Sequence, residues 1–328
     1  MKPSFFIGAY AASPQARNPH IWNPVAEGEY FRALGELKSV GGLELPFQGA
    51  LHPHDPAWLL EHFNPRWKAV LTPLPGTMER LRLDPTFGLA STSESGRRAA
   101  LEFIRSAQTA VHQLNQKFGK KTVVAVQLHS APNQLRAKAS LHSFVESLQE
   151  IQCWDWQGAE LWIEHCDQFI AGQTPAKGFL GLDEEMTAVH QLGSPFGISL
   201  NWGRSVLEVR SPEGALEHLD SVGSQGLLKA LIFSGACETH PLYGNWEDSH
   251  APFANPEMKS RDPTGFERLF LTEARVIEAL QMLPAEAVLG LKIQPLPATL
   301  SLEDRIHWVK ESVSFLNFCM AAAKREAR

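Results

Sequence analysis

The sequence predicts a (β/α)8 barrel, and three observations lead to this fold. Eight short apolar or β-branched runs recur along the 328 residues, each followed by Gly, Pro, Asn or Ser. Stretches with helical spacing separate these runs. The chain is also longer than the roughly 250 residues that such a barrel needs, which leaves room for long loops. The main alternative is a doubly wound open sheet, but no GxGxxG follows an early strand.

The eight runs give the predicted strands in chain order. They read FFIGAY, GGLELPF, AVLTPL, VVAVQLHSAP, LWIEHC, FGISLNW, ALIFSGA and LKIQPL. Because strand and helix alternate eight times, we expect one closed parallel barrel and interpret residues 1–328 as a single TIM-barrel domain. We expect the strands to begin near Phe5, Leu43, Val70, Val123, Leu161, Gly197, Ala230 and Leu291.

Helical spacing is clearest in RRAALEFIRSAQTAVHQLNQKFG, GFERLFLTEARVIEALQML and SLEDRIHWVKESVSFLNFCMAAAKR. The largest segment without it runs from Cys237 to Asp262 and is rich in Pro, Gly, Asn, His and Trp. This composition is typical of a long loop. We expect the loop over the C-terminal face of the barrel, where barrel enzymes keep their sites.

Composition narrows the class of protein. Hydrophobic residues make up 44% and charged residues 20%, as in ordinary soluble domains, and the net charge of −6 favours no nucleic-acid partner. The N-terminal apolar run is too short for a secretory signal or a membrane span, so we expect a cytoplasmic protein. The four cysteines lie far apart without CxxC spacing, and we interpret them as small buried hydrophobic residues.

Alternation along each strand predicts which side chains enter the barrel. Outward positions meet apolar helix faces, so Leu161 and Ile163 should face out while Glu160, Trp162 and Glu164 face in. Buried charged groups cost several kcal/mol each unless they are paired, and many of them together indicate a site. The same rule turns inward Glu44, Gln127, His129, Ser199, Asn201, Ser234, Lys292 and Gln294.

The inward residues form two layers. Glu44, Glu160 and Lys292 come earlier in their strands, where they could form a structural ion network or contact a substrate. The second layer lies nearer the C-terminal ends of the strands and would line the mouth of the barrel. It contains His129, Glu164, Asn201, Ser234 and Gln294.

Four short motifs resemble the xylose isomerase-like group of TIM barrels, which includes sugar isomerases, epimerases, inosose dehydratases and an apurinic endonuclease branch. They are GGLELPF on the second strand, LWIEHCD on the fifth, GISLNWGRS on the sixth, and WEDSH after the seventh. More narrowly, the chain is similar to a bacterial family in that group that carries a domain-of-unknown-function label. The resemblance implies a barrel over nearly the whole chain and, in most members, a divalent metal at its mouth.

In that group the metal is usually held by acids on the fifth, sixth and eighth strands and a histidine on the seventh. Of these, only Glu164 is present, because Asn201, Ser234 and Gln294 occupy the other positions. His165 should face the helix layer and Asp167 the following loop. We therefore predict no tightly bound metal at the usual position.

The DSH sequence resembles the Asp-x-His pair that some members use for a further metal. Asp248 and His250 could join His129 and Glu164 in a displaced site for Mn, Zn or Mg. Alternatively, His250 could act as a general acid or base, or the pair could be held by local hydrogen bonds alone.

Polar and aromatic residues near the strand ends are candidates for substrate binding. Arg204 could contact an anionic group or be bonded to loop carbonyls, and Trp202 and Trp246 offer flat surfaces that suit sugar rings. His52 and His54 also follow a strand, but have no certain partner. No GxSxG motif signals a serine triad.

The leading hypothesis is an enzyme that processes a carbohydrate or polyol by proton transfer, as an isomerase, epimerase or lyase. Glu164 is the candidate base, His129 or His250 the partner acid, and Arg204 or Lys292 the cation that stabilises an oxyanion. One alternative is a metal-dependent hydrolase using Glu164, Asp248 and His250 with His129 or His240. Another is a non-catalytic sugar-binding or regulatory barrel. The expected partner is a small carbohydrate rather than nucleic acid or membrane, and a homo-oligomer stays open.

Overall fold

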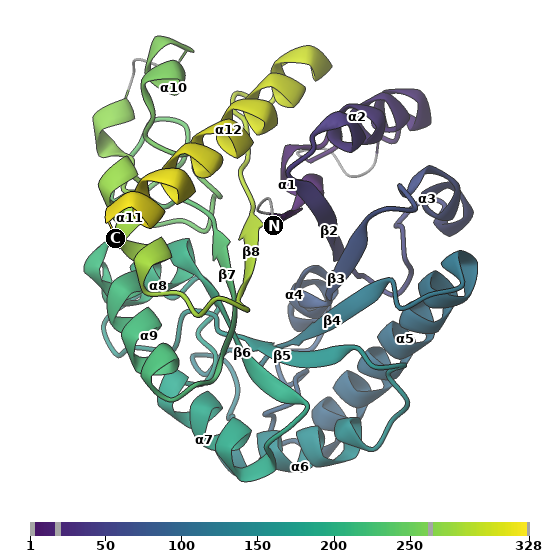
Figure 1. Cartoon of the computed structure of the whole chain (residues 1–328). Helices are drawn as coiled ribbons and strands as arrows, with labels where there is room; N and C mark the ends of the chain where they lie inside the picture. The colour runs from purple at the N-terminus through teal and green to yellow at the C-terminus, as the bar shows by residue number, and fades with distance from the viewer. Residues whose placement is uncertain (1–3, 17–20, 262–264, 327–328) are drawn as a thin grey trace. The chain divides into compact units, whose positions relative to one another are not determined.

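The computed structural model describes residues 4–16, 21–261 and 265–326. Its eight strands neighbour one another in chain order and close into a barrel, which confirms the predicted fold class (Figure 1). In the described residues, neighbouring strands pair in parallel. The strands are β1 (Phe5–Ile7), β2 (Val40–Pro46), β3 (Lys68–Thr72), β4 (Val123–Leu128), β5 (Glu160–Glu164), β6 (Phe196–Asn201), β7 (Leu228–Phe233) and β8 (Val288–Leu291).

Each strand begins within three residues of its predicted start. The starts of β2 and β8 differ most, by three residues each, and β8 ends at Leu291, where the prediction had it begin. Lys292 and Gln294 therefore follow the strand. Their backbone N–H groups donate to the carbonyls of Phe233 and His250, at 2.9 and 2.8 Å, so the chain leaves the sheet to pair with a loop.

Helices occupy most of the connections between strands. Several begin at a side-chain cap: Asn23, Asp55, Ser93 and Ser140 each accept a hydrogen bond from an N–H of the helix that follows. The helices are α1 (Ala9–Ala12), α2 (Pro24–Glu36), α3 (Pro56–His62), α4 (Leu74–Leu83), α5 (Glu94–Phe118), α6 (Leu141–Gln152), α7 (Leu182–Leu192), α8 (Trp202–Val209), α9 (Glu213–Ser224), α10 (Pro256–Arg261), α11 (Glu273–Gln281) and α12 (Leu302–Glu326).

Two of the three predicted helical stretches form α5 and α12, but the third is interrupted. Only a short 3-10 turn at Phe266–Arg268 precedes α11. The intervening backbone is extended because it pairs with the preceding loop, where the Ala254 N–H donates to the Leu271 carbonyl at 2.9 Å. Pairing with a neighbouring segment thus overrides helical spacing in this stretch.

The segment from Cys237 onward is not wholly irregular as predicted, because it contains α10; its last residue, Asp262, lies outside the described residues. Cys237, Tyr243 and Ala251 from this segment pack with Leu269 and Leu296 in a small apolar cluster. The loop therefore has a core of its own. That burial gives it a defined conformation rather than a set of open ones.

The chain forms two compact units, residues 1–42 with 201–328, and residues 43–200. The unit of residues 43–200 contains the register of β3 through β6, and the other contains the pairings of β1, β7 and β8. The single-domain interpretation of residues 1–328 stays a prediction. Among the helices that the structure describes, none combines the length and the apolarity that crossing a bilayer requires.

Candidate functional site

In the unit of residues 43–200, His129 and Glu164 form a buried pair. Glu164 ends β5, and His129 follows the last residue of β4. The register pairs Leu128 with Ile163, so the next step along both strands sets His129 beside Glu164. Their side chains meet through a hydrogen bond of 2.8 Å between Nε2 and Oε2, and they are 2% and 0% exposed.

The hydrogen bonds around this pair agree with the predicted inward register. Gln127 Nε2 donates to Ser199 Oγ at 3.4 Å, a contact that reaches from β4 to β6 past the intervening β5. Trp162 Nε1 donates to Glu160 Oε2 at 2.8 Å, as residues two apart on one strand face can. The interior of this unit is therefore polar at successive levels, and the His129–Glu164 pair lies at the carboxyl ends of its strands.

The residues that follow the pair point to the other side, as predicted for His165. His165 Nδ1 contacts Glu185 Oε2 of α7 at 2.7 Å, and Ser130 Oγ donates to Glu185 Oε1 at 2.5 Å. Asp167 accepts hydrogen bonds from the Lys177 N–H within the following loop. Neither His165 nor Asp167 thus adds a ligand beside Glu164.

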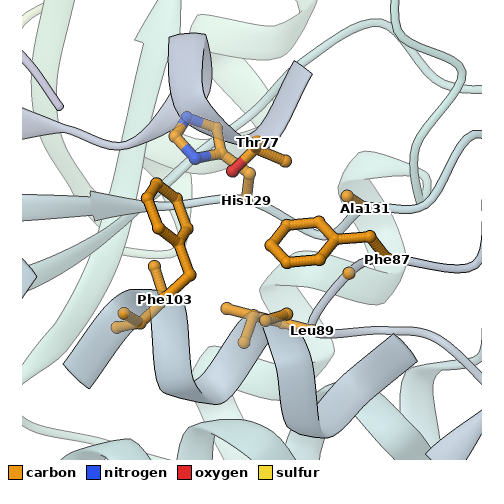
Figure 2. Close-up of a pocket in the computed structure, with 9 residues that line it drawn as sticks. Thr77, Phe87, Leu89, Phe103, His129 and Ala131 are labelled. Carbon is orange, nitrogen blue, oxygen red and sulfur yellow. The ribbon is translucent and has the colours of Figure 1, made fainter. Parts of the chain in front are cut away.

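A small cavity lies next to His129, with a volume of about 10 Å³, which is room for about one water molecule. Figure 2 shows the Thr77 hydroxyl beside the His129 ring, with the rings of Phe87 and Phe103 lining the cavity. Gly88 and Ala131 also line the cavity, and their backbones pack so closely that a Cβ atom on Gly88 would lie 2.2 Å from the Ala131 carbonyl oxygen. The cavity is too small and too apolar to hold a sugar.

Three side chains in this unit offer donor atoms that suit a metal ion. One atom each from His129, Glu164 and Cys166 lie within 4.8 Å of one another, and all three residues are buried. Nitrogen, oxygen and sulfur together are a donor set that zinc accepts. The residues present thus fit a metal, and they differ from the usual set of the group. The predicted lack of a tight metal at the usual position stays a prediction.

In the other unit, the DSH loop forms a separate network with β7 and α8. His250 Nδ1 lies 2.8 Å from Ser234 Oγ and 3.3 Å from Asp248 Oδ1. Asp248 Oδ2 in turn accepts from Arg204 Nε at 3.3 Å. Gly203 permits this packing at the start of α8, since a Cβ there would lie 2.4 Å from the Ser234 carbonyl oxygen.

This network is not a serine nucleophile site, in agreement with the sequence. A Ser-His-Asp relay needs the serine on one imidazole nitrogen and the acid on the other, whereas Ser234 and Asp248 both meet Nδ1. Asp248 and His250 are 12% and 15% exposed, and His250 has a left-handed φ of 53°. The network can instead hold an imidazole at the surface as an acid or base.

Several predicted binding residues have roles that the sequence left open. Trp202 is fully buried, so the expectation of an open ring face there is wrong. Trp246 is partly buried between Arg210, whose guanidinium lies 5.2 Å from its ring centre, and Phe270. Arg204 has a carboxylate partner in Asp248, and Asn201 accepts from the Arg204 N–H and so caps α8.

The remaining candidates lie in the barrel interior or in loops. Glu44 and Lys292 are buried, and Lys292 Nζ lies 5.4 Å from the Tyr10 ring centre. The Gln294 carbonyl accepts from the Tyr243 hydroxyl at 3.0 Å. His240 Nδ1 accepts from the N–H groups of Leu242 and Tyr243, which commits that nitrogen to a turn rather than to a metal.

His52 has the same role as His240 in a different loop. Its Nδ1 accepts from the N–H groups of His54 and Asp55 just before α3. Cys166, Cys237 and Cys319 are buried as expected, but Cys153 is exposed. Burial raises the pKa of the Cys237 thiol to about 11, so this sulfur stays protonated at neutral pH.

Sequence reasoning missed two buried polar residues on the side of β4 and β5 opposite the pair. Ser130 and Glu185 are 0% exposed, and both contribute to the contacts behind His129 and Glu164. A signal for Ser130 existed, because the residue after an inward one faces the helices. Glu185 carried a weaker signal as an acid on the buried face of a helix.

Comparison with known proteins agrees with this fold. An uncharacterized protein of Salmonella typhimurium (strain LT2), STM3670, is 33% identical over 319 residues, covering 95% of this chain and 96% of the relative. A xylose isomerase domain containing protein from Salmonella typhimurium LT2 has a TM-score of 0.57 at 11% identity, covering 96% of this chain and 97% of that one.

A second solved structure gives the same result. A putative xylose isomerase from Rhodospirillum rubrum has a TM-score of 0.58 at 12% identity, covering 96% of this chain and 98% of that one. The two structures show that this chain has the xylose isomerase-like TIM-barrel fold. The model of the domain of unknown function DUF4862 matches residues 6–308, so the chain belongs to the DUF4862 family.

Proposed function

We propose that this protein is an enzyme that acts on a carbohydrate or polyol derivative by proton transfer, as an isomerase, epimerase or lyase. The observation that carries the proposal is the 2.8 Å hydrogen bond between His129 Nε2 and Glu164 Oε2 at neighbouring strand ends. Barrel enzymes place their reacting groups at this end of the strands. The xylose isomerase-like fold supports the substrate class by analogy alone.

The pair can move a proton between two positions on a substrate. Glu164 takes a proton from a carbon next to a carbonyl, and the His129 N–H donates to the oxygen on which negative charge develops. Glu164 can then return its proton to the neighbouring carbon from the same face of the substrate, which moves the carbonyl group along the chain.

Burial sets a condition on this chemistry. With side-chain exposures of 2% and 0%, His129 and Glu164 meet substrate only when the residues that cover them move aside. Such movement is common in enzymes whose loops close over the reacting groups and exclude water. The partner of the protein would then be a small molecule, with no nucleic acid or membrane, in the cytoplasm.

The test is turnover of a library of aldoses, ketoses, polyols and their acids by the wild type and two variants. Glu164→Gln and His129→Gln keep the side-chain size and should lower kcat by about 100- to 10,000-fold. Glu146→Gln and His112→Gln are matched controls, since both side chains are partly exposed on helices, at 45% and 39%. Unchanged turnover in both site variants would overturn the proposal.

The geometry also favours a second candidate, a metal-dependent hydrolase. The specific observation is that donor atoms of His129, Glu164 and Cys166 lie within 4.8 Å of one another. A metal there would supply a Lewis acid and lower the pKa of a bound water. Metal analysis of protein purified without chelator decides: stoichiometric metal that is lost in Cys166→Ser and Glu164→Gln supports this candidate, and absence of metal removes it.

A third outcome belongs to a sugar-binding barrel without catalysis. Here a sugar would raise the melting temperature of the protein, since binding to the folded state alone stabilises it, while no library compound is converted. Thermal shift measured beside turnover on the same library separates this outcome from the proposed enzyme.

A further inference from the structure

We propose that Glu185 is a positioning residue that fixes the His129–Glu164 pair from the outer side of β4 and β5. This inference rests on the proposed function, because it assigns Glu185 a role in that same site. Glu185 lies on α7 and does not itself contact the pair through any hydrogen bond described above. It acts through the two residues that follow the pair in the chain, Ser130 and His165.

The contacts are short and buried. One carboxylate oxygen of Glu185 accepts from Ser130 Oγ at 2.5 Å, and the other lies 2.7 Å from His165 Nδ1. The three residues are 0%, 0% and 1% exposed. A single side chain thus holds the ends of two neighbouring strands, with one oxygen for each strand.

Because of strand geometry, the contacts of Glu185 on the outer face determine the orientation of the His129 and Glu164 side chains on the inner face. Successive side chains on an extended backbone point to opposite faces, so fixing Ser130 and His165 on one face sets the direction of His129 and Glu164 on the other. The backbone ladder continues beyond the strand, since the His165 N–H donates to the Ser199 carbonyl at 2.9 Å. Rotation of either strand end would separate the two groups of the pair.

A buried carboxylate destabilises the folded state more than an apolar side chain of the same size would. Its presence on α7 therefore indicates that Glu185 has a role beyond filling space. An isolated buried charge is strongly destabilising, and apolar residues of similar volume often pack as well. Here part of the cost is offset by the two contacts and by the start of α7, where Glu185 lies in the first turn and the helix dipole favours negative charge. The contacts impose an orientation that apolar packing would not.

The experiment compares Glu185→Ala with Asp183→Asn, an exposed acid in the same helical turn that serves as the control. On a substrate found in the library, Glu185→Ala should lower kcat by about 100-fold, the size of effect that a misplacement of about 1 Å produces, with a smaller change in KM. Asp183→Asn should leave both unchanged. Equal kcat in wild type and Glu185→Ala would overturn the proposal.

A second measurement does not depend on turnover. The proton between His129 Nε2 and Glu164 should give a downfield NMR resonance that disappears in His129→Gln. We expect this resonance to vanish in folded Glu185→Ala and to persist in Asp183→Asn. If no sugar is converted but the resonance responds in this way, the proposed function fails and the positioning role stands; a resonance that stays unchanged in Glu185→Ala overturns the role.

Two milder variants keep the test decisive if Glu185→Ala does not fold. Ser130→Ala and His165→Gln each remove one contact with Glu185. Each should weaken the NMR resonance and lower kcat, and Glu185→Gln, which keeps one oxygen acceptor, should retain part of both. A loss of melting temperature in these variants with the resonance intact would show a structural role only and would overturn the proposal.

Discussion

Two clusters of acid and histidine can be compared, one in each compact unit. The His129–Glu164 pair stands on the ends of regular strands, is almost completely buried and is set by strand register. The Asp248–His250 pair stands on a loop, is 12% and 15% exposed, and includes a residue with φ of 53°. A histidine beside an acid thus occurs once in a buried site fixed by the sheet and once in a more exposed site fixed by a loop.

The different settings show which interactions hold each cluster in place. In the strand pair, position follows from the sheet, so the side chains need only be the right types at the right places. In the loop network, position depends on a left-handed backbone and on the chain of contacts from Ser234 through His250 and Asp248 to Arg204. We therefore expect the two clusters to respond differently to substitution.

The largest expected difference concerns removal of one partner. Glu164→Leu leaves buried His129 without its acceptor and should lower the free energy of unfolding by about 3–5 kcal/mol. His250→Asn removes a partly exposed imidazole, leaves Asp248 paired with Arg204, and should cost about 1 kcal/mol. Urea unfolding of both variants measures the two values, and equal losses would show that burial does not separate the clusters.

A smaller effect is expected from the backbone of His250. Asparagine tolerates left-handed φ values and valine does not, so His250→Val should be less stable than His250→Asn by about 1–2 kcal/mol. Ser249 is the control, because its φ is not positive. The same two substitutions at Ser249 should differ by less, and a large difference there would remove the backbone explanation.

The unit that holds the loop network should also lose stability at alkaline pH. Burial raises the pKa of the Cys319 thiol to about 12 and that of Cys237 to about 11. Between pH 9 and these values the unfolded chain ionises these thiols and the folded chain does not, so stability falls as pH rises. At pH 10 the loss should be about 1 kcal/mol per thiol.

Cys319→Ala tests whether ionisation of this thiol lowers the stability of the protein as the pH rises. Its stability should fall less steeply than that of the wild type between pH 8 and pH 10, when both are followed by thermal unfolding. A wild-type curve that is flat over this range, or one whose slope the substitution does not change, would contradict the assignment to Cys319.

The smallest expected effect is at Cys153, the exposed thiol. In the native protein a thiol reagent should label one of the four cysteines rapidly, and Cys153→Ser should abolish that fast phase. The free energy of unfolding should change by less than about 0.5 kcal/mol, as at most surface positions. Fast labelling of two or more thiols would mean that Cys166, Cys237 or Cys319 is reached by transient opening.

The fold was predictable because the strand signal repeats eight times, so an error in the bounds of one strand does not change the predicted barrel. The strands that the prediction misplaced most are β2 and β8, where Gly41, Gly42 and Gly290 interrupt the apolar run. Glycine weakens a strand pattern in the sequence although it is tolerated in the sheet. The broken helix before α11 could not be predicted, since the pairing of Ala254 with Leu271 is not visible in local spacing.

The site was predictable where it depends on the sheet. Alternation along β5 and the end of β4 placed Glu164 and His129 on one face, and the structure joins them by a hydrogen bond. The loop contacts were not predictable in detail, because which imidazole nitrogen of His250 or His240 is used depends on turn geometry. The burial of Trp202 was missed because α8 begins directly at the end of β6.

The alternation across β4 and β5 limits how this protein can be re-engineered. One residue deleted within β4 would set Ser130 in the place of His129, and one deleted within β5 would set His165 in the place of Glu164. An inserted residue would set apolar Leu128 or Ile163 in those places instead. Loop grafting and chimeric designs should therefore keep the lengths of these strands fixed. Changes in length belong after Pro132 and after Asp167, where the chain has left the shared register.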